Sequence, residues 1–154
     1  MWNCPKLLHF LFLCGLKKQQ LEVESDLDFL LLGMVSTQKA SKIGFYLNLS
    51  ANLNLERVAD FKLPDYNPQA NTSFSKFAWF DEENHLNYTL LANKEFGNCL
   101  FNDLKQFDYL VTIRGGIEFF ELQKFMQQCR SASGIDLVAL IDNEKLKSKI
   151  SWIV

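Results

Sequence analysis

The spacing of apolar residues along the chain predicts alternating strands and helices. A continuous apolar run at 27–35, bounded by Asp26 and Ser36, is typical of a buried strand. At 38–53 apolar residues recur every three or four positions, which predicts an amphipathic helix capped by Ser36 or Thr37. Its expected buried stripe comprises Ala40, Ile43, Leu47 and Ala51, widened by Phe45 and Leu49.

The middle of the chain predicts a β-hairpin followed by a further strand. Two β-rich runs, at 74–80 and 86–91, flank an acidic, turn-forming connector at 81–85. Another apolar run at 107–113 predicts a strand that ends at Arg114-Gly115-Gly116.

A second helix and a last strand are expected after these glycines. The helix is predicted from 117 to about 131, with Gly134 as its glycine cap and an apolar stripe of Phe119, Leu122, Phe125, Met126 and Cys129. The strand is predicted at 135–141. The order β-α-β-β-β-α-β indicates an α+β fold, a mostly antiparallel sheet covered by two helices.

Composition narrows the class of protein. The chain has 154 residues, the size of one compact domain, and its 14 phenylalanines exclude a disordered chain. The formal net charge of −2 argues against a nucleic-acid-binding surface made by bulk charge, so no nucleic-acid partner is expected.

The first sixteen residues read as a separate segment. Their apolar run at 7–13 is much shorter than the roughly twenty residues that span a bilayer. No small-residue cleavage site follows it, and Phe12 and Leu13 precede Cys14 where a lipoprotein signal needs small residues. We therefore expect 1–16 to be a leader or extension outside the fold and 17–154 to be a single α+β domain, with no membrane partner. The alternatives are a short helix packed on the domain, or a genuine signal that makes the protein an exported lipoprotein.

No metal or cofactor is expected. The cysteines and histidines lack metal-binding spacing: Cys4, Cys14, Cys99, Cys129, His9 and His85. Structural or incidental roles are favoured for them, and reduced cysteines fit a cytoplasmic location. Asp81, Glu82 and Glu83 with His85 have the chemistry to bind a cation, although a solvated loop tip is the favoured interpretation.

Arg114-Gly115-Gly116 is the most suggestive candidate binding site. Two glycines let a backbone approach an anion at a helix N-terminus, and Asp108 is a candidate to assist there. The segment lacks the Lys-Ser/Thr of a P-loop, and a tight turn that needs glycine is favoured over an anion site. The hairpin aromatics can form a stacking surface, but core packing is favoured for Phe74, Phe77, Trp79, Phe80 and Tyr88.

The segment Phe101-Asn102-Asp103-Leu104-Lys105-Gln106-Phe107-Asp108-Tyr109 resembles the signature of the bacterial IPExxxVDY family. Asp108-Tyr109 stand as in the family name, whereas Ile, Pro, Glu and Val are replaced by Phe101, Asn102, Asp103 and Phe107. Further motifs are similar in the same order: D-L-D-F-L-L-L-G from Asp26, F-Y-L-N from Phe45, E-E-N-H-L from Glu82, L-V-T-I-R-G from Leu110, and L-K-S-K near the end.

The resemblance spans about residue 21 to the C-terminus, and it implies a small cytoplasmic bacterial protein from a family without an assigned activity. It also suggests structural roles: Asp108 satisfies a turn, and Tyr109 fixes its strand to a helix.

The sequence favours a non-catalytic binding or protein-interaction domain. Its partner is either an unknown protein or a second copy paired through an exposed sheet edge. The sequence shows no recognisable set of catalytic residues. The serines lack a nucleophile-elbow motif, and neither histidine has neighbours in sequence that mark it as a general base. The competing hypothesis is an enzyme or small-anion-binding protein with its site at Arg114-Gly115-Gly116.

Overall fold

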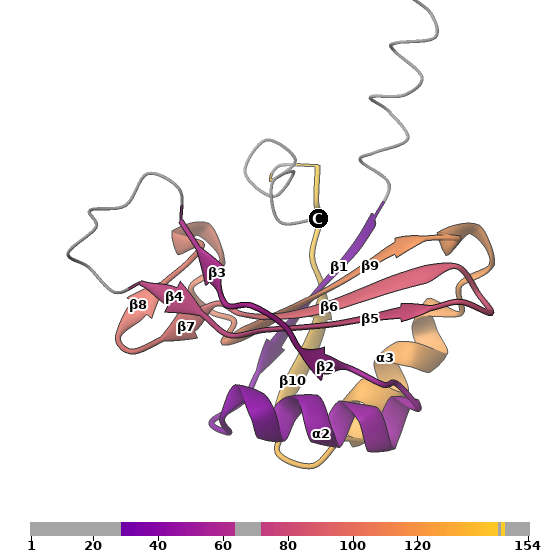
Figure 1. The fold of residues 1–154 in the computed structure, drawn as a ribbon, viewed down its shortest axis with the longest axis horizontal. Helices are drawn as coiled ribbons and strands as arrows, with labels where there is room; N and C mark the ends of the chain where they lie inside the picture. The colour runs from indigo at the N-terminus through magenta and orange to yellow at the C-terminus, as the bar shows by residue number, and fades with distance from the viewer. Residues whose placement is uncertain (1–28, 64–71, 145, 147–154) are drawn as a thin grey trace, which may run out of the picture.

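An antiparallel six-stranded sheet with two helices on one face forms the centre of the molecule (Figure 1). The computed structural model describes residues 29–63, 72–144 and 146. The sheet order is β10-β1-β9-β6-β5-β2, and each neighbouring pair is antiparallel. The expected α+β class is confirmed. The strands are β1 (Phe29–Val35), β2 (Glu56–Arg57), β5 (Lys76–Asp81), β6 (Leu86–Ala92), β9 (Tyr109–Gly115) and β10 (Leu137–Leu140).

The helices α2 (Ala40–Ala51) and α3 (Leu122–Ser131) lie below the sheet in Figure 1. At the left-hand end of that view are two short ribbons, β3 (Phe61–Lys62) with β4 (Ser73–Phe74) and β7 (Lys94–Glu95) with β8 (Asn98–Cys99). Two 3₁₀ turns complete the described elements, η1 (Asn102–Leu104) and η2 (Ile117–Phe119).

Strands β1 and β9 are covered on both faces, which explains why these two runs are almost continuously apolar. Side chains alternate between faces along a strand, so β9 directs Val111 and Ile113 toward the helices and Leu110 toward the opposite face. On that opposite face Leu110 packs with Phe74, Phe101 and other buried residues from the ribbons and η1. A strand buried on both sides has no polar face to produce period-two alternation.

The first helix differs from its prediction at its start and on its outer side. Its N-cap is Lys39, without a side-chain cap, because the Ser36 hydroxyl instead accepts the Gln38 N–H and donates to the Gly134 carbonyl. Ala40, Ile43, Leu47 and Ala51 are buried as expected. The prediction that two larger residues widen this face was wrong: Phe45 is 59% and Leu49 69% exposed, since both lie on the side of the helix turned from the sheet.

The second helix was predicted too long. Residues 117–119 form the separate turn η2, Phe120 is extended, and α3 begins at Leu122. Phe119 is therefore 91% exposed, contrary to its expected place on the buried stripe, while Phe120 packs against Tyr88. Helix α3 ends at Ser131 with an extended C-cap, Ala132, so Gly134 is not its cap.

Several sequence predictions fall outside the described residues. They concern the segment 1–16, the start of the expected domain at 17, and the C-terminal residues 147–154. No helix within the described ranges is long and apolar enough to cross a membrane.

Candidate functional site

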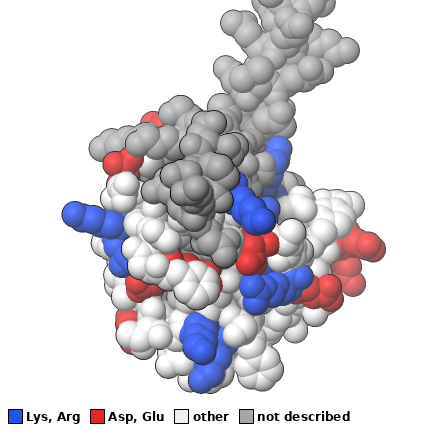
Figure 2. All heavy atoms as spheres, turned by 60° about the vertical axis from the view of Figure 1, so that its left-hand side comes forward, with Lys and Arg blue, Asp and Glu red and all other residues white. Residues whose placement is uncertain are grey.

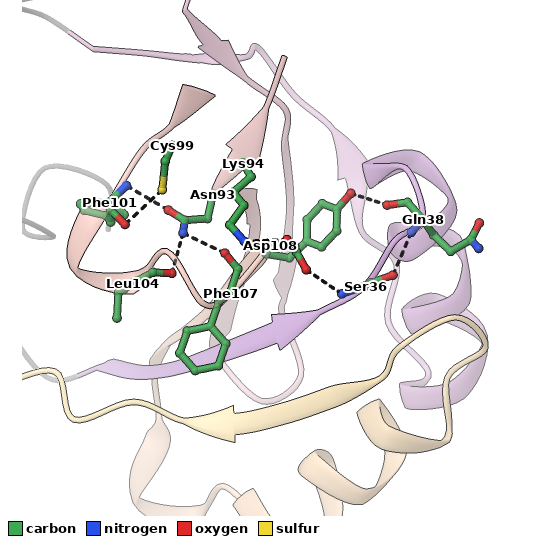
Figure 3. Close-up of polar contacts among 10 residues, drawn as sticks. Ser36, Gln38, Asn93, Lys94, Cys99, Phe101, Leu104, Phe107 and Asp108 are labelled. Carbon is green, nitrogen blue, oxygen red and sulfur yellow. Dashed lines mark hydrogen bonds and ion pairs between the residues drawn. The ribbon is translucent and has the colours of Figure 1, made fainter. Parts of the chain in front are cut away.

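Asn93 organises the segment that resembles the family signature (Figure 3). This fully buried side chain donates from Nδ2 to the carbonyls of Leu104 and Phe107, both at 2.9 Å. Its Oδ1 accepts the Phe101 N–H at 3.0 Å, and its backbone N–H donates to the Asp108 carbonyl at 2.9 Å. One amide thus satisfies three backbone groups of a turn that has no sheet partner of its own.

Asp108 and Tyr109 connect the start of β9 to the segment between β1 and α2. The Asp108 carboxylate accepts the Ser36 N–H at 3.0 Å and pairs with Lys94 Nζ at 3.1 Å. The Tyr109 hydroxyl donates to the Gln38 carbonyl at 2.5 Å. The Asp108 contact satisfies a backbone N–H just after β1, and the Tyr109 contact ties β9 to the segment that leads into α2. Burial, with the negative charges of Glu95 and Asp108, raises the pKa of Tyr109 to about 12, so its hydroxyl remains a donor.

The other signature residues are divided between packing and solvent. Phe101 and Phe107 are buried on the sheet face opposite the helices, whereas Asn102 and Asp103 in η1 are exposed. The Phe107 ring packs on Gly33, where an added Cβ would lie 2.5 Å from Phe107 Cγ.

The Arg114-Gly115-Gly116 turn packs on the tip of the β5–β6 hairpin. Gly115 has φ +115°, and an added Cβ would lie 2.2 Å from the His85 carbonyl oxygen, which accepts the Gly116 N–H at 3.2 Å. The glycines therefore serve a close approach between two backbone segments. The three-residue turn η2 comes directly after them, in place of the expected long helix.

Asp108 is not brought to this turn. It precedes β9, whereas Arg114 lies near the strand's far end, about 20 Å away at the usual rise per residue. Because they lie at opposite ends of one strand, they do not form a common site.

An open cleft of about 1290 Å³ lies between the end of α2, the β5–β6 hairpin and the η2–α3 segment. The tip of this hairpin lies toward the right-hand end of Figure 1. Trp79 and Tyr88 face each other across β5 and β6 and are stacked, with ring centroids 5.5 Å apart. Phe120 and Phe125 lie edge-on to each other at 5.3 Å, and both contact Tyr88. The sequence analysis singled out the hairpin aromatics and placed Phe125 on the buried stripe of the second helix, but it did not predict that Phe120 and Phe125 meet Tyr88.

The hairpin tip gives this cleft an acidic rim. Asp81 is buried, and its carboxylate accepts the backbone N–H groups of Glu83 and Asn84 and the Asn84 side-chain amide. Glu82, Glu83 and His85 are exposed, as expected for a solvated loop tip. His85 has φ +54°, a left-handed conformation typical of the last residue of such a hairpin loop.

The hairpin aromatics were expected to pack in the core. Phe74, Phe77 and Tyr88 are buried, Trp79 is half-buried, and Phe80 is 48% exposed, which contradicts the prediction for Phe80 alone.

The described residues contain no group of three or more His, Cys, Asp or Glu side chains placed to hold a metal ion. Cys99 and Cys129 are free. Burial raises the pKa of the Cys129 thiol to about 12, so it stays protonated at neutral pH. On the face of the described residues that Figure 2 shows, basic and acidic side chains are interspersed.

No family model matches the chain, and neither a curated protein nor a solved structure with significant similarity was found.

Proposed function

We propose that this protein is a non-catalytic interaction domain that binds a partner protein in the aromatic cleft. The observation that carries the proposal is the exposure of large aromatic surface around a concave site. Phe119, on the cleft wall, is 91% exposed beside the aromatic cluster of Trp79, Tyr88 and Phe120. Aromatic side chains in a desolvated concavity are typical anchors of protein interfaces.

Selection of phage-displayed random peptides against the immobilised full-length chain tests this proposal. Enriched peptides are expected to bind the wild type and to lose binding to Phe119→Ser. The matched control is Phe96→Asn, which removes another exposed phenylalanine, at the β7–β8 turn, where Asn suits the left-handed backbone. The absence of enriched peptides, or equal losses in the two variants, would contradict the proposal.

Self-association through β10 is a second candidate function. Strand β10 forms a sheet edge, and its Leu137 and Leu140 are 52% and 51% exposed. Because the Ile141 N–H donates to the Leu31 carbonyl, the adjacent Leu140 backbone groups point away from β1. They are available to the same strand of a second copy, although Arg130 already donates to the Val138 carbonyl at 3.4 Å.

Light scattering at several protein concentrations tests self-association. We expect a dimer that Leu140→Lys converts to a monomer, because a lysine on the edge opposes strand pairing. Val58→Lys, beside the opposite edge strand β2, should leave the dimer intact. A monomeric wild type would refute this candidate.

We also propose membership of the IPExxxVDY family and a cytoplasmic location. This proposal rests on the motifs that follow one another in the same order from Asp26 to the end of the chain. The free Cys99 and Cys129 fit a reducing compartment. Mass spectrometry of the native N-terminus tests the location, since a lipid on Cys14 would establish export instead.

A further inference from the structure

We propose that the aromatic cleft binds an arginine side chain presented by an extended basic segment of the partner. This inference rests on the proposed interaction function and specifies the chemistry of the ligand. It depends on three features of the cleft: a flat aromatic surface, an excess of negative charge, and a tyrosine hydroxyl with no partner among the described residues.

The aromatic surface suits a planar cation. The rings of Trp79 and Tyr88 are 15° from parallel, and Trp79 is only half-buried, so part of the indole remains open to a ligand. A guanidinium group stacks on such faces and is attracted by their negative quadrupole, with tryptophan the most effective ring.

The charge of the cleft favours a cation. Its lining includes four carboxylates, from Asp81, Glu82, Glu83 and Glu121, and one ammonium, from Lys124. The net charge is −3 with His85 neutral, against −2 for the entire chain. Lys124 lies 3.5 Å from Glu121, which offsets the one ammonium. An anionic ligand would be repelled, whereas a basic segment is attracted over several ångströms.

The Tyr88 hydroxyl supplies a polar contact. Tyr88 is 6% exposed and lines the cleft, yet its hydroxyl makes no hydrogen bond to another described residue. This oxygen is not among the buried atoms of the described residues that lack a partner, so it is open to the cleft and able to accept an N–H from a guanidinium.

The size of the cleft favours a peptide over a small molecule. Its volume of about 1290 Å³ exceeds the usual few hundred to 1,000 Å³ of small-ligand pockets. Its walls come from α2, the hairpin and α3, so several residues of an extended segment fit beside the arginine.

An NMR titration of the full chain tests the inference with two blocked peptides, acetyl-Gly-Arg-Gly-Arg-Gly-amide and its citrulline counterpart. Citrulline keeps the shape of arginine but is neutral. We expect the arginine peptide to bind at least about fivefold more tightly than the citrulline peptide. Its affinity should fall as salt is added.

Two matched variants locate the site. Glu121→Gln should lower the affinity for the arginine peptide about threefold, because it removes a rim carboxylate and leaves Lys124 without its counter-charge. Glu118→Gln removes the same charge from exposed η2 outside the cleft lining and should leave the affinity unchanged.

Equal affinity for the two peptides would overturn the arginine inference and leave the interaction function standing. Equal losses of affinity in the two variants would contradict the placement of the arginine site in the aromatic cleft. If neither peptide binds, the arginine inference fails, and the phage selection then decides the interaction function separately.

Discussion

Single residues decide how the sheet face opposite the helices is packed. Gly33 in β1 has the Phe107 ring where its side chain would be, and Asn93 holds that ring's backbone in place. The two positions work together, because the turn needs both a fixed backbone and a space for the ring. Neither is recognisable as special from composition, since a glycine in a strand and a buried asparagine each have many possible causes.

Gly33→Ala is expected to destabilise the protein by about 2 kcal/mol or more, because its Cβ would overlap the Phe107 ring in a filled core. Gly44→Ala in α2 is the control. Its Cβ would meet Phe77 at 3.4 Å, an ordinary contact, and alanine favours a helix by up to about 1 kcal/mol. Urea unfolding midpoints measure both effects, and equal changes would refute this role of Gly33.

Among the elements, the long strands and the hairpin followed their sequence patterns, although β9 begins and ends two residues later than predicted. The short strands β2, β3, β7 and β8 were not predicted, and the start of the second helix was predicted wrongly. The runs that became β5, β6 and β9 are long and apolar, and local pattern determined them. The break at Phe120 has no local signal such as Pro or Gly. The Phe120 ring packs against the nearby Phe125 and also against Tyr88 in β6, and the second contact joins segments that are distant in sequence. The cleft was unpredictable for the same reason.

The η1 turn tests whether this segment is built as the family signature implies. Asn102 opens the turn after an extended Phe101, and no backbone hydrogen bond from its N–H is present among the described residues. Proline, the residue in the family name, suits such a first position, so Asn102→Pro should raise stability by about 0.4–1 kcal/mol.

Asp103→Pro is the control for that substitution. It should destabilise the protein, because proline disfavours the helical conformation of the residue before it, here Asn102. Thermal unfolding of the two variants measures whether Asn102→Pro stabilises the protein and Asp103→Pro destabilises it. A clear loss of stability in Asn102→Pro would contradict the proposed likeness to the family at this segment.

For the whole molecule, burial of Tyr88, Tyr109 and Cys129 predicts alkaline sensitivity. Burial raises the pKa of each group to about 12, from 10.0 for the tyrosines and 9.0 for the cysteine. Between about pH 9 and 12 the unfolded chain therefore binds fewer protons than the native chain, and stability falls as pH rises. Each group adds a slope of at most about 1.4 kcal/mol per pH unit, and below pH 9 its stabilising contribution is fully present.

Urea unfolding under reducing conditions at a series of pH values measures this slope. Cys129→Ala should unfold more easily near neutral pH, because it leaves a small cavity, yet lose less stability between pH 9 and 10 than the wild type. A wild-type free energy of unfolding that stays constant from pH 9 to 12 would contradict the raised pKa values of Tyr88, Tyr109 and Cys129.

Our central proposal is that the partner protein binds in the aromatic cleft. The most direct measurement is a map of backbone amide shift changes when the arginine peptide is added to the full chain. We expect the changes to cluster on the hairpin tip at 79–88 and on 116–128, while β7–β8 at the other end stays unchanged. Changes centred on β7–β8 or on β10, with the cleft unaffected, would contradict the proposal.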